Sequence, residues 1–521
     1  MTAELDEELV IAHLLGAPFL AYVINLDPGN AQARLDGQLA ELADPGERAF
    51  HDLIAHTVTL INMANASPDG PPSELVRRLG WIDMDREQSH ANLFRLANGG
   101  ELPTVPTGLN EVEAALVAIA IDYFPLTLLP TSSDQPFPGK PLISGARVAA
   151  LEAALRSTND PLLTLFPNGN DEELAYYTSS GLGYGPLWAF RVGECALATA
   201  EQMIRVSGNP EPSAFLDRVL RNLGVMRTLC TEGSADVLAL VTYENAVLPA
   251  GLTLRGPRDG FLRAATERDP RPPVASATTM VLETTCNVSL SVGRMPPPAD
   301  SDFWLGVSEL RVESLLVSLA GLLATASQEQ RGMPRQRGTR IFDPFQPYVG
   351  WYLSTPGVPW LAFPPEQLVD LEEWLLRLAE HYHPSIRVAV KRCVSAFSER
   401  PDTDDALIDL VIALENIFAT RGPKLRQRMA TALGNLLGNS SESREAIGDT
   451  ARAVYDARSD LVHGDELADT TFGHPKDNAE HLVLQTFEVL FRDRPELIAD
   501  RRGRRRLWKE SRESGRGYAG V

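Results

Sequence analysis

An arginine and a histidine lie five residues apart near the C-terminus, at Arg458 and His463. Histidine exchanges protons near neutral pH, and the planar guanidinium of arginine suits phosphate oxygens. Metal-free cleavage of RNA needs a group that takes the proton of the attacking 2′-OH. It also needs a cation for the charged phosphorane and an acid for the leaving oxygen. One arginine and one histidine could therefore supply the minimum for this chemistry.

The spacing alone is weak evidence, because the chain has nine histidines and many arginines. Arg377 and His383 already form a second pair of similar spacing. A random pair of this kind more often has a structural role, in which Arg458 pairs with Glu415 across a helical bundle and His463 caps a helix end. Both interpretations stay open on spacing alone.

The region from Pro364 onward has the periodicity of helices that would position the pair. Apolar residues recur at helical spacing in Glu366–Ala379, Ile386–Phe397, Ala406–Phe418, Leu425–Leu437 and Asn478–Phe491. Ser443 could cap a further helix that runs through Tyr455 and stops at Gly464. Several amphipathic helices joined by short loops predict an up-and-down bundle.

Helix geometry constrains how the pair could act. Five residues turn through about 500°, which places Arg458 and His463 about 140° apart around one helix axis. Arg458 would lie near the apolar stripe and His463 away from it. At the helix end, the macrodipole would favour protonated His463. A complete site would therefore depend on a symmetric second copy or on a helix break at Gly464.

The segment from Tyr455 to Gly464 reads Y-D-A-R-S-D-L-V-H-G. It resembles the Arg-x4–6-His signature of HEPN domains in the form typical of their Apea-like branch, and the preceding helices follow that family's order from about Glu366 to Asp493. The resemblance implies a homodimer with a composite site, in which Arg458 and His463 are catalytic. The positions that would support them are Tyr455, Ser459, Asp460 and Glu415. Glu415 could orient Arg458 or stabilise the bundle.

Domains of this branch resemble components of antiphage and toxin–antitoxin systems. The resemblance therefore implies a regulated, metal-independent endoribonuclease that uses no cofactor. RNA and an antitoxin or trigger protein would be its partners. Two alternatives from other classes remain: a non-catalytic dimerising scaffold or sensor, and a nucleic-acid-binding regulator that acts through a basic tail.

Charge limits where nucleic acid could bind. A net charge of −21 opposes contact over the whole surface, so any contact must be local. The segment Arg501–Arg516 has seven Arg and one Lys against two Glu, a net charge of +6. Gly and Ser surround these residues, which predicts disorder. The candidate nucleic-acid contacts are Arg501, Arg502, Arg504, Arg505, Arg506 and Lys509.

Other features indicate a reduced, cytoplasmic protein outside the membrane. Four widely separated cysteines form no metal-binding pattern and predict free thiols. The apolar run Ala114–Pro130 contains Asp122 and Pro125 and is shorter than the roughly 20 residues of a membrane span, so it predicts a buried helix. His381 and His383 alternate beside Glu380, but a third metal ligand is not evident.

The predicted fold class is mainly α, with a length of 521 residues that exceeds one core. We predict a helical region at 1–130, a linker and mixed region at 131–220, a mixed α/β region at 221–363, a HEPN-like bundle at 364–495 and the basic tail at 496–521. Asp236–Ala246 and Thr278–Val292 are rich in Val, Thr and Leu and predict strands. The region before the bundle would sense a trigger or restrain the nuclease.

Overall fold

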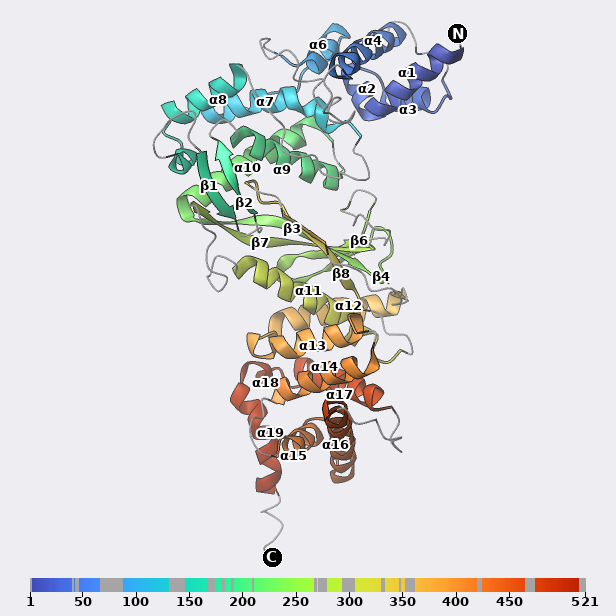
Figure 1. Cartoon of the computed structure of the whole chain (residues 1–521), viewed down its shortest axis with the longest axis vertical. Coiled ribbons are helices and arrows are strands. Elements are labelled where there is room, and N and C mark those ends of the chain that lie inside the picture. Colours follow the sequence, from blue (N-terminus) through green and yellow to red (C-terminus); the bar gives the residue numbers. More distant parts are fainter. Residues whose placement is uncertain are drawn as a thin grey trace, which may run out of the picture. The chain divides into compact units, whose positions relative to one another are not determined.

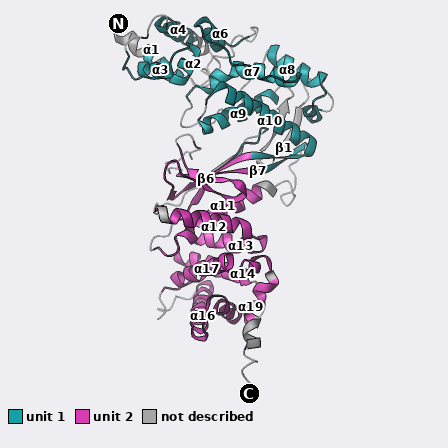
Figure 2. Cartoon of the chain, turned by 180° about the vertical axis from the view of Figure 1, so that it is seen from behind, with its two compact units in different colours: residues 1–237, 287–306, 341–348 teal, residues 238–286, 307–340, 349–521 magenta. Residues whose placement is uncertain are grey.

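The computed structural model describes the chain in blocks and leaves several connecting segments out. The described residues are 2–39, 42, 46–65, 88–130, 146–166, 174–179, 183–188, 192–208, 210–266, 269, 279–292, 305–328, 333–345, 348–351, 361–400, 402–418, 424–463 and 474–514. The first part of the predicted linker and mixed region, at 131–145, and the predicted stop at Gly464 lie outside them. The chain forms two compact units (Figure 2), which comprise residues 1–237, 287–306 and 341–348 for unit 1, and 238–286, 307–340 and 349–521 for unit 2. The predicted mainly α fold class is confirmed.

Unit 1 consists largely of helices (Figure 1). They are α1 (Thr2–Leu15), α2 (Ala17–Val23), α3 (Pro28–Leu35), α4 (Gly46–Asn65), α6 (His90–Ala97), α7 (Glu111–Thr127), α8 (Ala146–Ser157), α9 (Val192–Ser207) and α10 (Pro212–Glu232), with the short helix η1 (Pro161–Leu165). Helix α7 is the predicted buried helix, and Val117 and Ala120 on it are fully buried. Among the described residues, no helix is long and apolar enough to cross a membrane.

A small sheet contains the two predicted strands, which are confirmed as β3 (Ser234–Glu244) and β7 (Met280–Val292). The strand order is β2-β1-β7-β3-β8-β9, and β6 also pairs with β7 and with β5. The other members are β1 (Leu174–Ser179), β2 (Gly183–Trp188), β5 (Thr253–Arg255), β6 (Phe261–Ala264), β8 (Arg335–Ile341) and β9 (Tyr348–Trp351). The pairs β1–β2, β1–β7, β5–β6 and β6–β7 are antiparallel, whereas β4 (Ala246–Val247) and β10 (Leu361–Ala362) form a separate parallel pair.

Unit 2 contains most of helix α11 and then a run of helices (Figure 1). They are α11 (Leu305–Ala324), α12 (Pro365–His381), α13 (Arg387–Ser398), α14 (Thr403–Phe418), α15 (Leu425–Leu437), α16 (Ser441–His463), α17 (Pro475–Arg492), α18 (Glu496–Ala499) and α19 (Arg501–Ser514). Helices α12 to α17 occupy the segments where the sequence predicts helices. Leu410, Leu414 and Phe418 on α14 are fully buried, as the one-sided apolar stripe predicts.

Helices α15 and α16 pack against each other in opposite directions. A Cβ atom at Gly434 would lie 2.6 Å from the carbonyl oxygen of Arg444, so only glycine permits this approach. The predicted N-cap at Ser443 is wrong by three residues. Ser440 caps the helix instead. Its Oγ accepts a hydrogen bond from the Ser443 amide at 3.1 Å, and Ser443 Oγ accepts one from the Ser440 amide at 3.0 Å.

The predicted disorder of the basic tail is wrong for Arg501–Ser514, which form α19. Asp500 caps this helix, with its Oδ1 accepting from the Arg502 amide at 2.8 Å. The helix packs on α14 and α15, so the helical region of unit 2 extends beyond the predicted boundary at 495. Residues 515–521 lie outside the described part of the chain.

Candidate functional site

Arg458 and His463 lie on the last turns of α16, which continues without a break from Ser441 to His463. His463 is the final residue of the helix and is exposed, whereas Arg458 is half-buried. Val454 precedes Arg458 by one turn and is fully buried, which confirms that Arg458 borders the apolar stripe. On one helix the two residues are separated by about 140° and a rise of about 7.5 Å. Their side chains therefore leave α16 in different directions.

The guanidinium of Arg458 is held by burial and not by a direct partner. Its Nε is buried without a hydrogen-bond partner. Among the described residues, Arg458 takes part in no ion pair within 4.0 Å. Since its two terminal nitrogens are neither buried nor hydrogen-bonded to the described residues, they contact solvent and remain open to an anion.

Glu415 on α14 lies close enough to Arg458 to feel its charge. Burial raises the pKa of Glu415, and the Arg458 guanidinium opposes that rise. The two side chains nevertheless do not come within ion-pair distance, so the bridge suggested as a structural role for Arg458 is not formed directly.

The remaining predicted supporting residues share α16 with the pair. Tyr455, Ser459 and Asp460 are half-buried. Tyr455 precedes Arg458 by three residues, and Ser459 and Asp460 precede His463 by four and three, so each is a neighbour of one member of the pair on the helix surface. The helix thus brings Tyr455 to Arg458 and places Ser459 and Asp460 beside His463.

The histidines at and just beyond the end of α12 make contacts within their own segment. His383 Nδ1 accepts from the Ser385 amide at 3.2 Å and caps the short helix η5 (Pro384–Ile386). His381 Nε2 lies 3.8 Å from Glu380 Oε2, at the outer limit of an ion pair. Among the described residues, no group of three or more His, Cys, Asp or Glu side chains is placed to hold a metal.

The predicted basic residues divide between two sides of α19. Arg502, Arg505 and Arg506 are exposed, as a nucleic-acid contact requires. Arg504 is fully buried and its prediction as a nucleic-acid contact is wrong. Its Nε donates to the Ile417 carbonyl at 2.6 Å, Nη1 to the carbonyls of Leu497 and Ile498, and Nη2 to Ser385 Oγ at 3.0 Å. The side chains of Arg501 and Lys509 lie outside the described set.

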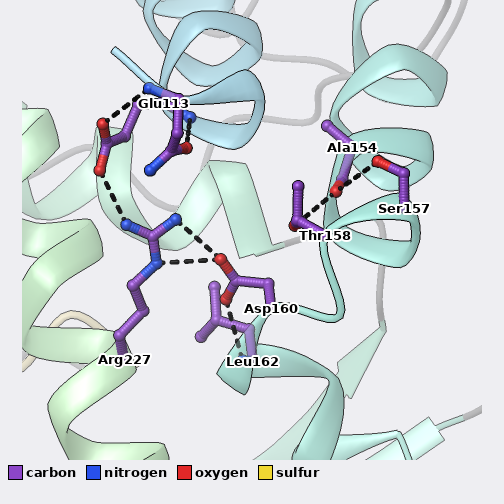
Figure 3. A network of polar contacts seen from close by, with 8 residues as sticks. Glu113, Ala154, Ser157, Thr158, Asp160, Leu162 and Arg227 are labelled. Carbon is purple, nitrogen blue, oxygen red and sulfur yellow. Dashed lines mark hydrogen bonds and ion pairs between the residues drawn. The ribbon is translucent and has the colours of Figure 1, made fainter. Parts of the chain in front are cut away.

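An ionic network in unit 1 was not foreseen from the sequence (Figure 3). Arg227 on α10 donates to Asp160 Oδ2 from Nε at 2.9 Å and from Nη2 at 2.7 Å, and to Glu113 Oε1 from Nη1 at 2.9 Å. Burial acts to raise the pKa of Glu113, but hydrogen bonds from Asn110 and Arg227 outweigh it and lower this pKa. The network ties α7 and η1 to α10, and it was missed because Arg227 is 67 residues from Asp160 and 114 residues from Glu113.

A polar cavity of about 300 Å³ in unit 2 was also missed. Its polar lining is Ser314, Ser318, Arg335, Gln336, Ser398 and Glu399, from α11, β8 and the end of α13. Burial lowers the pKa of Arg335, which Glu244 and Glu399 partly offset. The lining therefore combines both signs of charge with hydroxyl groups, and no single ligand chemistry is selected by it.

Comparison with known proteins adds no identity to this geometry. Family models, curated proteins and solved structures were all searched, and no significant match to this chain was found in any of them. The assignment to the Apea-like HEPN family therefore stays a prediction that rests on the residues of α12 to α17.

Proposed function

We propose that the chain is a regulated, metal-independent endoribonuclease of the HEPN type, with Arg458 and His463 as its catalytic residues. The observation that supports this best is the environment of Arg458. This half-buried cation has terminal nitrogens open to an anion, and it lies on the same helix end as an exposed histidine. Antiphage defence or a toxin–antitoxin system is the proposed context, with an antitoxin or trigger protein as regulator.

Each group has a role in the proposed reaction. His463 takes the proton of the 2′-OH, whose oxygen then attacks the adjacent phosphorus. Arg458 binds the non-bridging oxygens and stabilises the phosphorane. The P–O5′ bond breaks, and His463, protonated in the first step, supplies the proton that the 5′ oxygen needs. The products are a 2′,3′-cyclic phosphate and a 5′-OH end.

The separation of the two residues on α16 favours a site made by two copies. Their side chains diverge by about 140°, so one chain does not point both at a single phosphate. A two-fold related copy would bring its His463 toward Arg458 of the first chain, so that each site would hold the arginine of one copy and the histidine of the other. Val462, beside His463, is 52% exposed and would be covered by such a contact.

Cleavage of single-stranded RNA in EDTA tests this proposal. We expect wild-type protein to cleave and both Arg458→Ala and His463→Ala to lose about 100-fold or more of the rate, the usual size of an acid–base contribution. Arg452→Ala on the same helix and His481→Ala on α17 are matched controls that should retain activity. Equal cleavage by wild type and both site variants would exclude the catalytic role.

A further inference from the structure

We infer that α15 and α19 together form an RNA-binding surface that leads to the proposed cleavage site. This surface, the α15–α19 basic face, consists of Lys424, Arg426, Arg428, Arg502, Arg505 and Arg506. Lys424 immediately precedes α15, and the three arginines from 502 onward lie on α19. The inference rests on the proposed function because it names single-stranded RNA as the ligand.

The basic face exists because α19 is anchored by its opposite side. Arg504 is fully buried and hydrogen-bonds carbonyl oxygens at the ends of α14 and α18. Leu507 is also buried, and its carbonyl accepts from Asn435 Nδ2 on α15 at 2.6 Å. These contacts fix the helix on the bundle, so the exposed arginines are held in place and do not belong to a loose tail.

The exposed arginines of α19 fall on one stripe. At 100° per residue, Arg505 and Arg506 lie about 60° and 40° on either side of Arg502. The buried Arg504 and Leu507 point about 160° and 140° away from Arg502. One helix turn, about 5.4 Å, separates successive levels of the stripe. The guanidinium groups therefore form a ladder of cations along the outer side of α19.

Helix α15 joins this ladder to the helix that carries the candidate site. The guanidinium of Arg428 lies 4.7 Å from the ring centre of Trp508 on α19. On its other side, Arg426 forms an ion pair with Asp456 of α16. Figure 1 shows α15 between α19 and α16. Asp456 lies about 160° around the helix from Arg458 but only about 20° from His463, two turns further on, so the basic face reaches the His463 side of the last turns of α16.

The chemistry of the face favours a nucleic-acid backbone. A net charge of −21 with +6 in the segment Arg501–Arg516 leaves −27 on the rest of the chain, so this cationic stripe stands against an acidic protein. Arginine forks bind phosphate oxygens through paired donors. Single-stranded RNA offers such phosphates in series, and it is also the substrate of the proposed reaction. The acidic surface of a second copy is the competing partner.

Fluorescence anisotropy with labelled oligouridine of about 20 nucleotides tests the inference, over about 50 to 200 mM KCl. All proteins carry Arg458→Ala so that cleavage does not interfere. Replacing Arg502, Arg505 and Arg506 by Ala should weaken binding at least about tenfold and reduce the slope of log K against log[salt] by about 2, near 0.7 for each lost phosphate contact. The matched triple replacement of Arg377, Arg387 and Arg494 by Ala removes the same charge elsewhere in unit 2 and should change neither quantity.

An unchanged slope in the α19 triple variant would overturn the inference. Loss of self-association by light scattering, with RNA affinity intact, would also overturn it and would assign the face to the acidic surface of a second copy. If RNA binds through α19 but the chain with Arg458 intact cleaves nothing, the basic face stands and the proposed nuclease fails. The two ideas therefore fail separately.

Discussion

Arg504 and Arg458 of unit 2 differ in burial and in how many of their guanidinium nitrogens already have a hydrogen-bond partner. Arg504 is fully buried, and all three of its nitrogens donate within the bundle. Arg458 is half-buried, and its terminal nitrogens are not used by the described residues. The first arginine is therefore a structural residue, while the second has donors left for a ligand.

Replacing Arg504 by Ala should destabilise the bundle. The carbonyl oxygens of Ile417 and Leu497 would lose their donor in a buried place, at a cost of about 2 to 5 kcal/mol. The control is Arg506→Ala on the exposed side of the same helix, which should change stability by less than about 0.5 kcal/mol. Urea unfolding measures both, and equal stability of the two variants would show that the buried contacts do not hold α19.

The buried carboxyl of Glu313 on α11 should make unit 2 less stable as pH rises. Burial raises its pKa to about 7, although Arg258 opposes the rise with Nε 2.9 Å from Glu313 Oε1. In the unfolded chain the pKa is near the ordinary 4.5. The protonated form is therefore favoured by folding, so its stabilisation is complete below about pH 4.5 and is lost as pH rises through about 7.

Glu313→Gln should flatten this part of the pH dependence. Between about pH 5 and pH 8, wild type should lose up to about 3 kcal/mol more stability than the variant, the equivalent of the shift in pKa. Denaturant unfolding gives the free energy of unfolding of each protein at the two pH values. Because each protein is compared with itself, any effect of the substitution that does not depend on pH cancels. The same pH dependence in both proteins would show that Glu313 does not titrate in this range.

At the scale of elements, close contact between α15 and α16 positions the candidate site. The contact depends on Gly434, which faces the backbone of Arg444. It places Arg426, at the start of α15, beside Asp456 near the end of α16. Because Arg458 lies on the following half-turn, the packing of these two helices sets where its guanidinium projects.

Gly434→Ala should destabilise this helix pair by about 1 to 3 kcal/mol, since a Cβ 2.6 Å from the Arg444 carbonyl oxygen forces the helices apart. Gly224→Ala on α10 is the matched control, because nothing lies within 4 Å of its Cβ position. In that open helical site alanine should instead stabilise by up to about 1 kcal/mol. Thermal unfolding distinguishes the two directions, and a stabilising Gly434→Ala would contradict the close contact.

The elements that the sequence predicts are those with regular apolar periodicity. Helices α12 to α17 and strands β3 and β7 belong to this group, because apolar residue types mark the face of each element that becomes buried. Strand β8 was missed, since Arg335, Arg337 and Arg340 read as polar although all three are buried. Glu244, which is far from Arg337 in sequence, lies 3.1 Å from its Nε and balances its charge. Helix α19 was missed for the same reason, because its anchor is Arg504.

The candidate site was predictable only as far as one helix extends. The sequence places Arg458 and His463 on the end of α16, and their divergence follows from the helical repeat. The unused terminal nitrogens of Arg458 and the influence of its charge on Glu415 depend on packing between α14 and α16. A second copy, which the proposed chemistry needs, has no signal in the sequence other than the family resemblance.

At the scale of the whole molecule, an acidic chain carries a cluster of arginines on one helix of unit 2 and its candidate catalytic pair on another. Long-range repulsion opposes RNA over most of such a surface, and the basic face provides a local exception. If two copies form the site, each contributes its own α16 and its own basic face. The account therefore requires a dimer, and a chain that is only monomeric at micromolar concentration would oppose it.

Mixing two inactive variants tests the composite Arg458/His463 site most directly. Arg458→Ala and His463→Ala proteins are combined, allowed to exchange subunits, and assayed for RNA cleavage in EDTA. In a mixed dimer, the intact Arg458 of one copy meets the intact His463 of the other, so random pairing should restore about a quarter of wild-type activity. The products should carry 2′,3′-cyclic phosphate ends. If subunits exchange but the mixture stays as inactive as either variant alone, the two residues do not form one site across two chains.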